Sequence, residues 1–210
     1  AAGPGAGGVP GYRAPFELLM APAPASCTMA ISAPHLKPIS FIMKLSPCFT
    51  LEEFIFSETC TRSGIDNMPT ESIVANLRIT AAGMEKVRVA LGNRPIHITS
   101  GYRCEALEKI LCQKDFVRWC GVRGKKASDP AAWNAYFAGK AHPKGYSADF
   151  VCRSFGTPEQ IVAAIRKTDI RFDQLIMEGN WVHISFAPDM RMQAMSATFD
   201  NGTPSFQALA

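Results

Sequence analysis

The sequence predicts an α+β domain with a small, mainly antiparallel sheet flanked by helices. Two observations predict this class: the last two strand patterns are joined by a tight Gly-Asn turn, and strands and helices do not alternate as in a parallel βαβ sheet. Hydrophobic residues make up 47% of the 210 residues and charged residues 19%, so most of the chain should fold around a core. No apolar run approaches the roughly 18–20 residues that span a bilayer, and we expect no membrane partner.

Composition divides the chain into three parts. Residues 1–42 are rich in Ala, Gly and Pro and show no periodicity. We expect a disordered or extraneous N-terminal tail there, because such a segment buries too little apolar surface to offset the entropy of ordering. The segment also lacks the basic start of a signal peptide, which favours a protein made in the cytoplasm. Residues 43–190 are the predicted domain, with a helical insert at about 112–140, and residues 191–210 are expected to be a C-terminal tail.

Helices are predicted from their caps and periodicity. Thr50 and Glu53 form the capping box of a first helix. A long helix should run from Glu71 to about Leu91, because apolar residues recur there at helical spacing after Thr70 as a cap. The sequence predicts further helical segments at 104–138, with breaks near 121–124 and 129–130, and after the opening Thr157-Pro158-Glu159.

Strands are predicted where apolar residues alternate with polar ones. The segments with this pattern are 95–99, 147–152, 174–178 and 181–186. In the last of these, three apolar side chains share one face, so His183 points to the other face. In 147–152 the same alternation separates Asp149 from the apolar side chains. If the apolar faces share one core, Asp149 and His183 lie together on the open face of the sheet.

A third candidate ligand precedes this pair. His142 lies seven positions before Asp149, and Gly145 between them lets the chain bend. Two imidazoles and one carboxylate leave the fourth tetrahedral position open, as in a catalytic zinc site. Each signal alone is weak, because a single histidine on a strand is more often a hydrogen-bonded structural residue and Arg103 alone is typical of a surface.

Three separated segments together carry a resemblance to a known family. They are Ser100-Gly101-Tyr102-Arg103, then His142-Pro143-Lys144-Gly145-Tyr146-Ser147-Ala148-Asp149-Phe150, then Trp181-Val182-His183. In this order they resemble the signature of the zinc D-alanyl-D-alanine carboxypeptidase family, which includes phage endolysins that cut L-alanyl-D-glutamate bonds. The resemblance covers roughly Met43 to Pro188.

The resemblance implies a fold, a cofactor and roles for single residues. It implies a hedgehog/D-Ala-D-Ala peptidase-like fold whose Zn²⁺ lies on the open face of the sheet, with three ligands: His142, Asp149 and His183. Arg103 would hold a substrate carboxylate or orient the scissile carbonyl. Glu178 would be the catalytic base, with Asp173 as the reserve candidate. The implied reaction is hydrolysis of peptide bonds next to D-amino acids in peptidoglycan, by a D,D-carboxypeptidase or an endolysin-type endopeptidase that acts on the cell wall as a monomer.

Departures from the family pattern keep an alternative open. Lys140 stands where many relatives have serine, and Asn180 lies where several relatives have the acid. The alternative is a non-catalytic, zinc-stabilised module of the same fold that binds the wall or is part of a phage particle.

The insert has two interpretations of its own. Its aromatic residues form either a lid or wall-binding face, or they pack on the core. The basic stretch from Lys109 to Lys144 is a solvated helical face or a patch for an anionic wall polymer. No motif supports a nucleic-acid partner.

Overall fold

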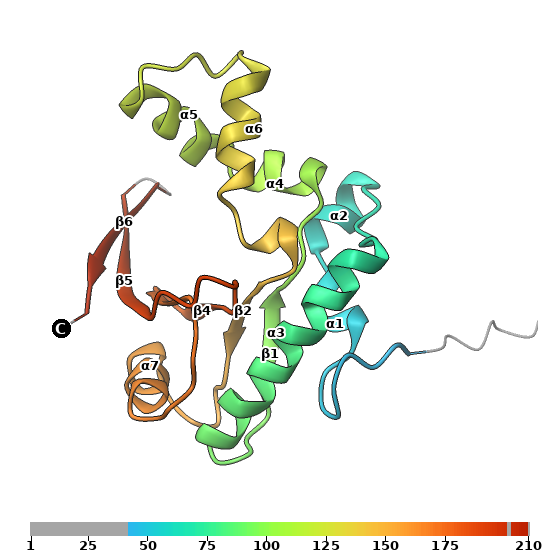
Figure 1. Ribbon diagram of the computed structural model, residues 1–210, viewed down its shortest axis with the longest axis vertical. Coiled ribbons are helices and arrows are strands. Elements are labelled where there is room, and N and C mark those ends of the chain that lie inside the picture. The colour runs from blue at the N-terminus through green and yellow to red at the C-terminus, as the bar shows by residue number, and fades with distance from the viewer. Residues whose placement is uncertain (1–41, 201–202, 210) are drawn as a thin grey trace, which may run out of the picture. The chain divides into compact units, whose positions relative to one another are not determined.

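The computed structural model describes residues 42–200 and 203–209 (Figure 1). The tail predicted at 1–42 lies outside the described residues, except for Ile42. Seven α-helices and six strands are found in the described part, together with one 3-10 turn. The helices are α1 Leu51–Ile55, α2 Glu58–Ser63, α3 Glu71–Ala90, α4 Glu105–Leu111, α5 Gln113–Val122, α6 Pro130–Ala138 and α7 Pro158–Arg166, and the 3-10 turn is η1 His142–Lys144. The strands are β1 His97–Ser100, β2 Ser147–Val151, β3 Gln174–Glu178, β4 Trp181–Ser185, β5 Gln193–Asp200 and β6 Thr203–Ala208.

The strands form one sheet in the order β1-β2-β4-β3-β5-β6. Every neighbouring pair is antiparallel except β3 and β5. This exception arises because β4 returns the chain to the end of the sheet where β3 begins, and β5 then starts beside β3 on its other edge. The predicted α+β class with a mainly antiparallel sheet is confirmed.

The predicted C-terminal tail is wrong. Residues 193–200 and 203–208 form strands β5 and β6, and residues 193–197 of β5 pair with the whole of β3. The sequence of this segment does not indicate a strand, because the alternation of its apolar residues is irregular. Its pairing partner also lies about twenty residues earlier in the chain. The backbone hydrogen bonds to β3 and the antiparallel pairing of β5 with β6 complete this edge of the sheet.

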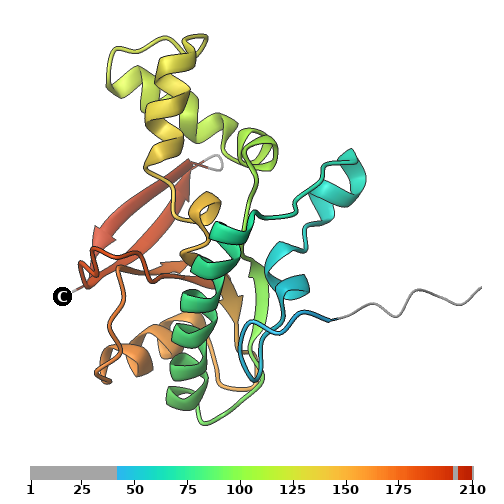
Figure 2. The ribbon, with the colours of Figure 1, turned by 45° about the vertical axis from the view of Figure 1, so that its right-hand side comes forward.

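The main core lies on one face of the sheet. The helices α3 and α7 pack on this face, as Figure 2 shows, and their apolar side chains join those of β2, β3 and β4 in one cluster. The caps predicted for these helices are present: Thr70 accepts from Ile73 N at the start of α3, and Thr157 forms a capping box with Gln160 at the start of α7. The opposite face therefore receives the polar side chains of the same strands.

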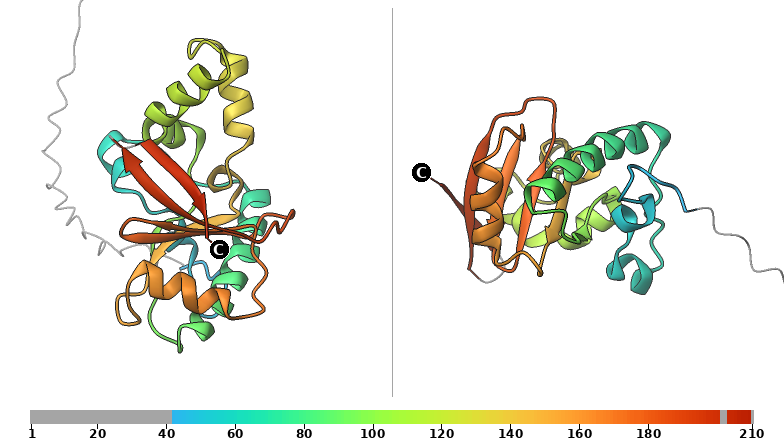
Figure 3. Two further views of the ribbon diagram at one scale, coloured as in Figure 1. Left: turned by 90° about the vertical axis from the view of Figure 1, so that its left-hand side faces the viewer. Right: turned by 90° about the horizontal axis from the view of Figure 1, so that it is seen from below.

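The helical insert has a small core of its own. The breaks predicted near 121–124 and 129–130 separate α5 from α6, and α4 precedes them. Its aromatic rings pack against one another, with Phe116 5.1 Å from Trp133 and 5.2 Å from Tyr136 between ring centroids. They form a cluster separate from the main core, so the expectation that they pack on that core is wrong. The β5–β6 hairpin reaches this insert, where Arg118 of α5 donates to the backbone oxygen of Pro204 (Figure 3).

Candidate metal centre

Three polar side chains meet on the face of the sheet that lies opposite the main core. His142 comes from η1, Asp149 from β2 and His183 from β4. Asp149 and His183 are direct partners in the antiparallel pairing of β2 with β4, as the alternation of both strands predicts. One ligand atom from each of the three residues lies within 4.8 Å of the others, so together they could hold a metal ion.

The turn that presents His142 is held against α3. Gly145 ends η1 with φ +75°, and a side chain there would meet the backbone oxygen of Ile73 at 3.0 Å. Thr80 donates to the carbonyl of Gly145 at 2.7 Å, and Asn76 donates to the carbonyl of Lys144 at 2.9 Å. Glycine and the two donors of α3 thus determine where His142 enters the site.

The hydrogen bonds of the histidines leave one nitrogen of His142 for a ligand. Its Nδ1 lies 2.6 Å from the carbonyl oxygen of Gly101, which only accepts, so this nitrogen carries the proton. Its Nε2 then faces Asp149 Oδ1 at 3.2 Å, and His183 Nδ1 lies 2.8 Å from the same oxygen. A backbone partner of this kind is the usual way in which a metal-binding histidine is oriented.

Burial and charge set the protonation of the site. His142, Asp149 and His183 are 7%, 5% and 8% exposed, so the three side chains are largely shielded from water. Arg103 and His142 both lie against the carboxylate of Asp149. Burial and the nearby Arg103 lower the pKa of His142, which favours the neutral imidazole. Burial alone would raise the pKa of Asp149, but His142, His183 and Arg103 hold that pKa well below its usual value.

Arg103 lies at the site as predicted, but its guanidinium contacts protein carboxylates. Its Nη2 donates to Asp149 Oδ2 at 2.6 Å and its Nε to Ser100 Oγ at 2.9 Å. Its Nη1 lies 3.7 Å from Oε2 of Glu108, a residue that the sequence analysis did not single out. Glu108 resembles any surface glutamate of an amphipathic helix, and only its 1% exposure distinguishes it.

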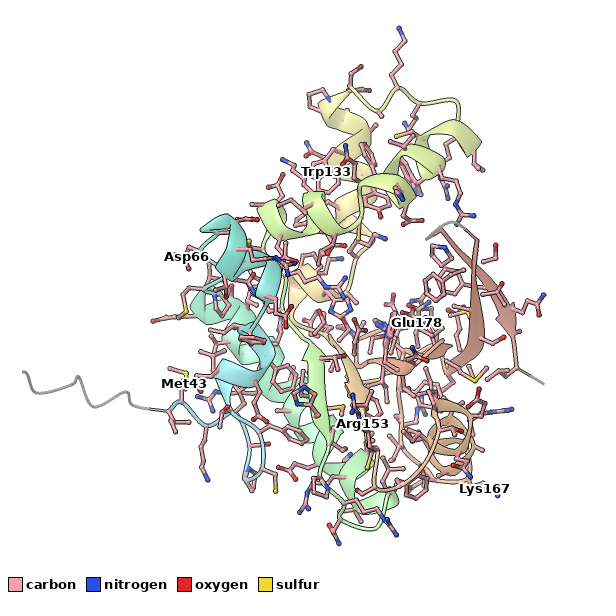
Figure 4. The ribbon with its side chains drawn as sticks, turned by 180° about the vertical axis from the view of Figure 1, so that it is seen from behind. Met43, Asp66, Trp133, Arg153, Lys167 and Glu178 are labelled. Carbon is pink, nitrogen blue, oxygen red and sulfur yellow. The ribbon has the colours of Figure 1, made fainter. Side chains whose placement is uncertain are left out.

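Glu178 lies on the same face as the three candidate ligands. In the pairing of β3 with β4, Ile176 faces His183 and Glu178 faces Trp181, so Glu178 is two positions along the face from His183. Trp181 Nε1 donates to Glu178 Oε2 at 3.0 Å. Burial is the largest cause of the raised pKa of Glu178, and the charge of Asp149 raises this pKa further. The charges of His183 and Arg103 act in the opposite direction. Figure 4 shows Glu178 on the sheet below the insert that carries Trp133.

Asp173, the reserve base, has a different environment. It precedes β3, whereas Glu178 ends this strand, so the two residues are roughly 16 Å apart along the backbone of the strand. Arg191 binds both of its oxygens, Nε to Oδ1 at 2.6 Å and Nη2 to Oδ2 at 2.7 Å. These hydrogen bonds lower the pKa of Asp173. Both oxygens of Asp173 are thus bound by Arg191, and Ser185 also donates to Oδ2 at 3.3 Å.

The donor set fits a zinc ion. Two imidazole nitrogens and one carboxylate oxygen are ligands that zinc takes, and they leave a coordination position for water or substrate. His142 is buried and favoured in its neutral form, and Asp149 is ionised, which are the protonation states that bind metal.

Comparison with known protein families gives an independent observation. A family model described as Peptidase M15 matches residues 47–111. The chain is therefore similar to Peptidase M15 proteins over this stretch. The match confirms the resemblance to the zinc D-alanyl-D-alanine carboxypeptidase family and supports a hydrolase of the metallopeptidase class. No curated protein matches the chain.

The matched segment and the candidate ligands do not overlap. The Peptidase M15 match contains Arg103 and Glu108 but ends at Leu111, before the first candidate ligand. The meeting of two histidines and an aspartate outside the matched residues therefore supports a metal site independently.

In the described part of the chain, no helix is long and apolar enough to cross a membrane.

Proposed function

We propose that this protein is a zinc metallopeptidase that hydrolyses peptide bonds next to D-amino acids in bacterial peptidoglycan, as a D,D-carboxypeptidase or an endolysin-type endopeptidase. The observation that carries the proposal is the convergence of His142, Asp149 and His183, with Glu178 on the same face, in a chain that is similar to Peptidase M15 proteins over part of its length. The substrate class rests on the family resemblance, with peptidoglycan or its stem peptides as the partner.

The three ligands hold zinc on the face of the sheet opposite the main core, in a fold of the hedgehog/D-Ala-D-Ala peptidase type. When bound, zinc lowers the pKa of a water to about 7 and polarises the scissile carbonyl. His142 is kept in place by the carbonyl of Gly101, and His183 by its strand position opposite Asp149. Rigid strands and a held turn keep such ligands in a constant geometry.

Glu178 acts as the general base. Its carboxylate accepts the proton of the attacking water and passes it to the leaving amine. A raised pKa suits this role, because it makes the carboxylate of Glu178 a stronger base. The Trp181 N–H orients one oxygen, so the other oxygen is available for the proton.

Arg103 binds the substrate. Its guanidinium offers donors in a flat fork, which matches a carboxylate or a developing oxyanion. It lies within hydrogen-bond distance of Asp149, so a substrate group bound to Arg103 would be adjacent to the metal ligands. The remaining expectations, namely a monomer and a domain at 43–190, are part of the same proposal, with β5 and β6 now added to the domain.

Metal content and hydrolysis test the proposal directly. Protein purified without chelators or a histidine tag should contain about one zinc per chain and cleave purified stem peptides. The variants His142→Ala and His183→Ala should lose both the zinc and the activity while they remain folded by circular dichroism. His97→Ala is the matched control, because His97 is an exposed histidine of β1 outside the site.

Two results would count against the proposal. Unchanged hydrolysis after complete metal removal would exclude the zinc mechanism. One zinc per chain without cleavage of any stem peptide would favour the non-catalytic alternative, a zinc-stabilised wall-binding or phage structural module.

A further inference from the structure

Glu108 is a buried acid beside the candidate metal centre that the proposed reaction does not use. It lies on α4, its side chain is 1% exposed, and its Oε2 has no hydrogen-bond partner. The nearest cation is Arg103, whose Nη1 is 3.7 Å from this oxygen. We propose that Glu108 is a positioning residue for Arg103: it holds the guanidinium and balances its charge when Asp149 binds the metal. The inference rests on the proposed metal site.

The charges around Asp149 show why a second carboxylate is needed. Asp149 Oδ2 accepts from Arg103, and Oδ1 faces both histidines. When Asp149 ligates a divalent cation, its single negative charge no longer compensates Arg103, whose side chain is only 16% exposed. A buried guanidinium without a compensating carboxylate is strongly unfavourable, and repulsion from the metal adds to this cost. Glu108 is the other carboxylate that forms an ion pair with Arg103.

The orientation of Glu108 is already suited to this role. Cys112, at the C-terminal end of α4, donates from Sγ to Glu108 Oε1 at 3.0 Å. Burial and the Glu108 carboxylate raise the pKa of the Cys112 thiol to about 11, so the thiol keeps its proton at neutral pH. One oxygen is thereby held by Cys112, and the other faces Arg103. A shift of less than about 1 Å would bring Nη1 to the usual length of a charge-assisted hydrogen bond.

Zinc affinity in three proteins tests the inference without any measurement of hydrolysis. The dissociation constant is measured by competition with a chelator for the wild type, Glu108→Gln and the double variant Arg103→Met/Glu108→Gln. Glu108→Gln should weaken zinc binding about tenfold, because the positive charge of Arg103 near the metal is then left uncompensated. The double variant removes this charge as well and should return to within about threefold of the wild type.

The matched control is Glu105→Gln. Glu105 lies on the same helix but pairs with Lys109 and is half exposed, so this variant should bind zinc as the wild type does. Thermal unfolding of each variant distinguishes the positioning role from a purely structural role of Glu108. A purely structural role would lower the melting temperature of Glu108→Gln, and adding Arg103→Met would not restore its zinc affinity.

The outcomes distinguish this inference from the proposed function. The inference is overturned if Glu108→Gln binds zinc as tightly as the wild type, or if the double variant stays as weak as the single one. Zinc binding with the expected rescue but without peptide cleavage would overturn the proposed function alone. A chain that binds no zinc would overturn both.

Discussion

Glu178 is the residue that separates a peptidase from a metal-stabilised binding module. It shares a face with His183 and receives a hydrogen bond from Trp181. Glu178→Gln keeps the size and the hydrogen bond but removes the ability to accept a proton. We expect kcat to fall by about a hundredfold or more, because general base catalysis contributes at least that factor. Steady-state hydrolysis of a stem peptide measures the change.

Zinc content is the internal control for this variant. It should remain at about one per chain, because Glu178 is not among the proposed ligands. Glu58→Gln is a matched substitution at an exposed glutamate that pairs only with Arg62, and it should leave the rate unchanged. A Glu178→Gln enzyme with the wild-type rate would show that this carboxylate is not the base.

At the scale of elements, α3 packs closely against the main core. Gly83 lies in the middle of α3 against the ring of Phe186, and a Cβ at this position would overlap the ring. Phe186 is 4% exposed and belongs to the main core, so the ring has little room to move. Close packing of this helix also positions His142, because α3 holds the turn that carries it.

Gly83→Ala should therefore destabilise the protein although alanine favours helices. The overlap should cost about 1–3 kcal/mol of unfolding free energy, which outweighs the gain of up to about 1 kcal/mol in helix propensity. Gly121→Ala on α5 is the matched control, since no atom lies within 4 Å of its Cβ position, and it should be neutral or stabilising. Urea denaturation of both variants gives the comparison, and equal stabilisation by both would contradict the packing argument.

At the scale of the whole molecule, an ion pair joins the segment before β3 to the segment before β5. Asp173 precedes β3 and Arg191 precedes β5, so their bidentate contact links the parallel pair of strands at its start. Asp173 is 2% exposed, whereas the side chain of Arg191 is 47% exposed. Water around the exposed side chain of Arg191 weakens the ion pair. The buried carboxylate of Asp173 nevertheless needs Arg191 to compensate its charge.

Asp173→Asn should lower the free energy of unfolding at pH 7 by about 1–3 kcal/mol, because the buried half of the pair loses its charge. Since the pKa of Asp173 is lowered in the folded state, its stabilisation is present above its unfolded pKa of about 3.9 and is lost as the pH falls through the folded pKa. The difference between variant and wild type should therefore shrink below about pH 4. Denaturation curves at several pH values measure this, and a constant difference would contradict it.

Zinc content is the second measurement on this variant. It should be unchanged, because Asp173 is not among the proposed ligands and its two oxygens are bound by Arg191. Loss of zinc from a folded Asp173→Asn protein would show that Asp173 acts at the metal centre after all.

Local signals in the sequence were sufficient for most elements and for part of the site. Caps such as Thr50 and Thr157 and the alternation in β2 and β4 involve neighbours within a few residues, so the pattern itself reveals them. The same alternation placed Asp149 and His183 on one face, and the structure pairs them directly. The spacing of His142 before Asp149 added the third candidate, and the family resemblance assigned all three as zinc ligands.

Contacts between distant residues were decided only by the tertiary structure. Arg103 pairs with Asp149 across 46 positions, and Arg191 reaches Asp173 across 18. The strands β5 and β6, the burial of the metal centre and the burial of Glu108 arise in the same way, because each depends on which surfaces the folded chain brings together. Local backbone preferences therefore determined the elements and the candidate ligands, whereas long-range packing and charge compensation decided the environment in which they act.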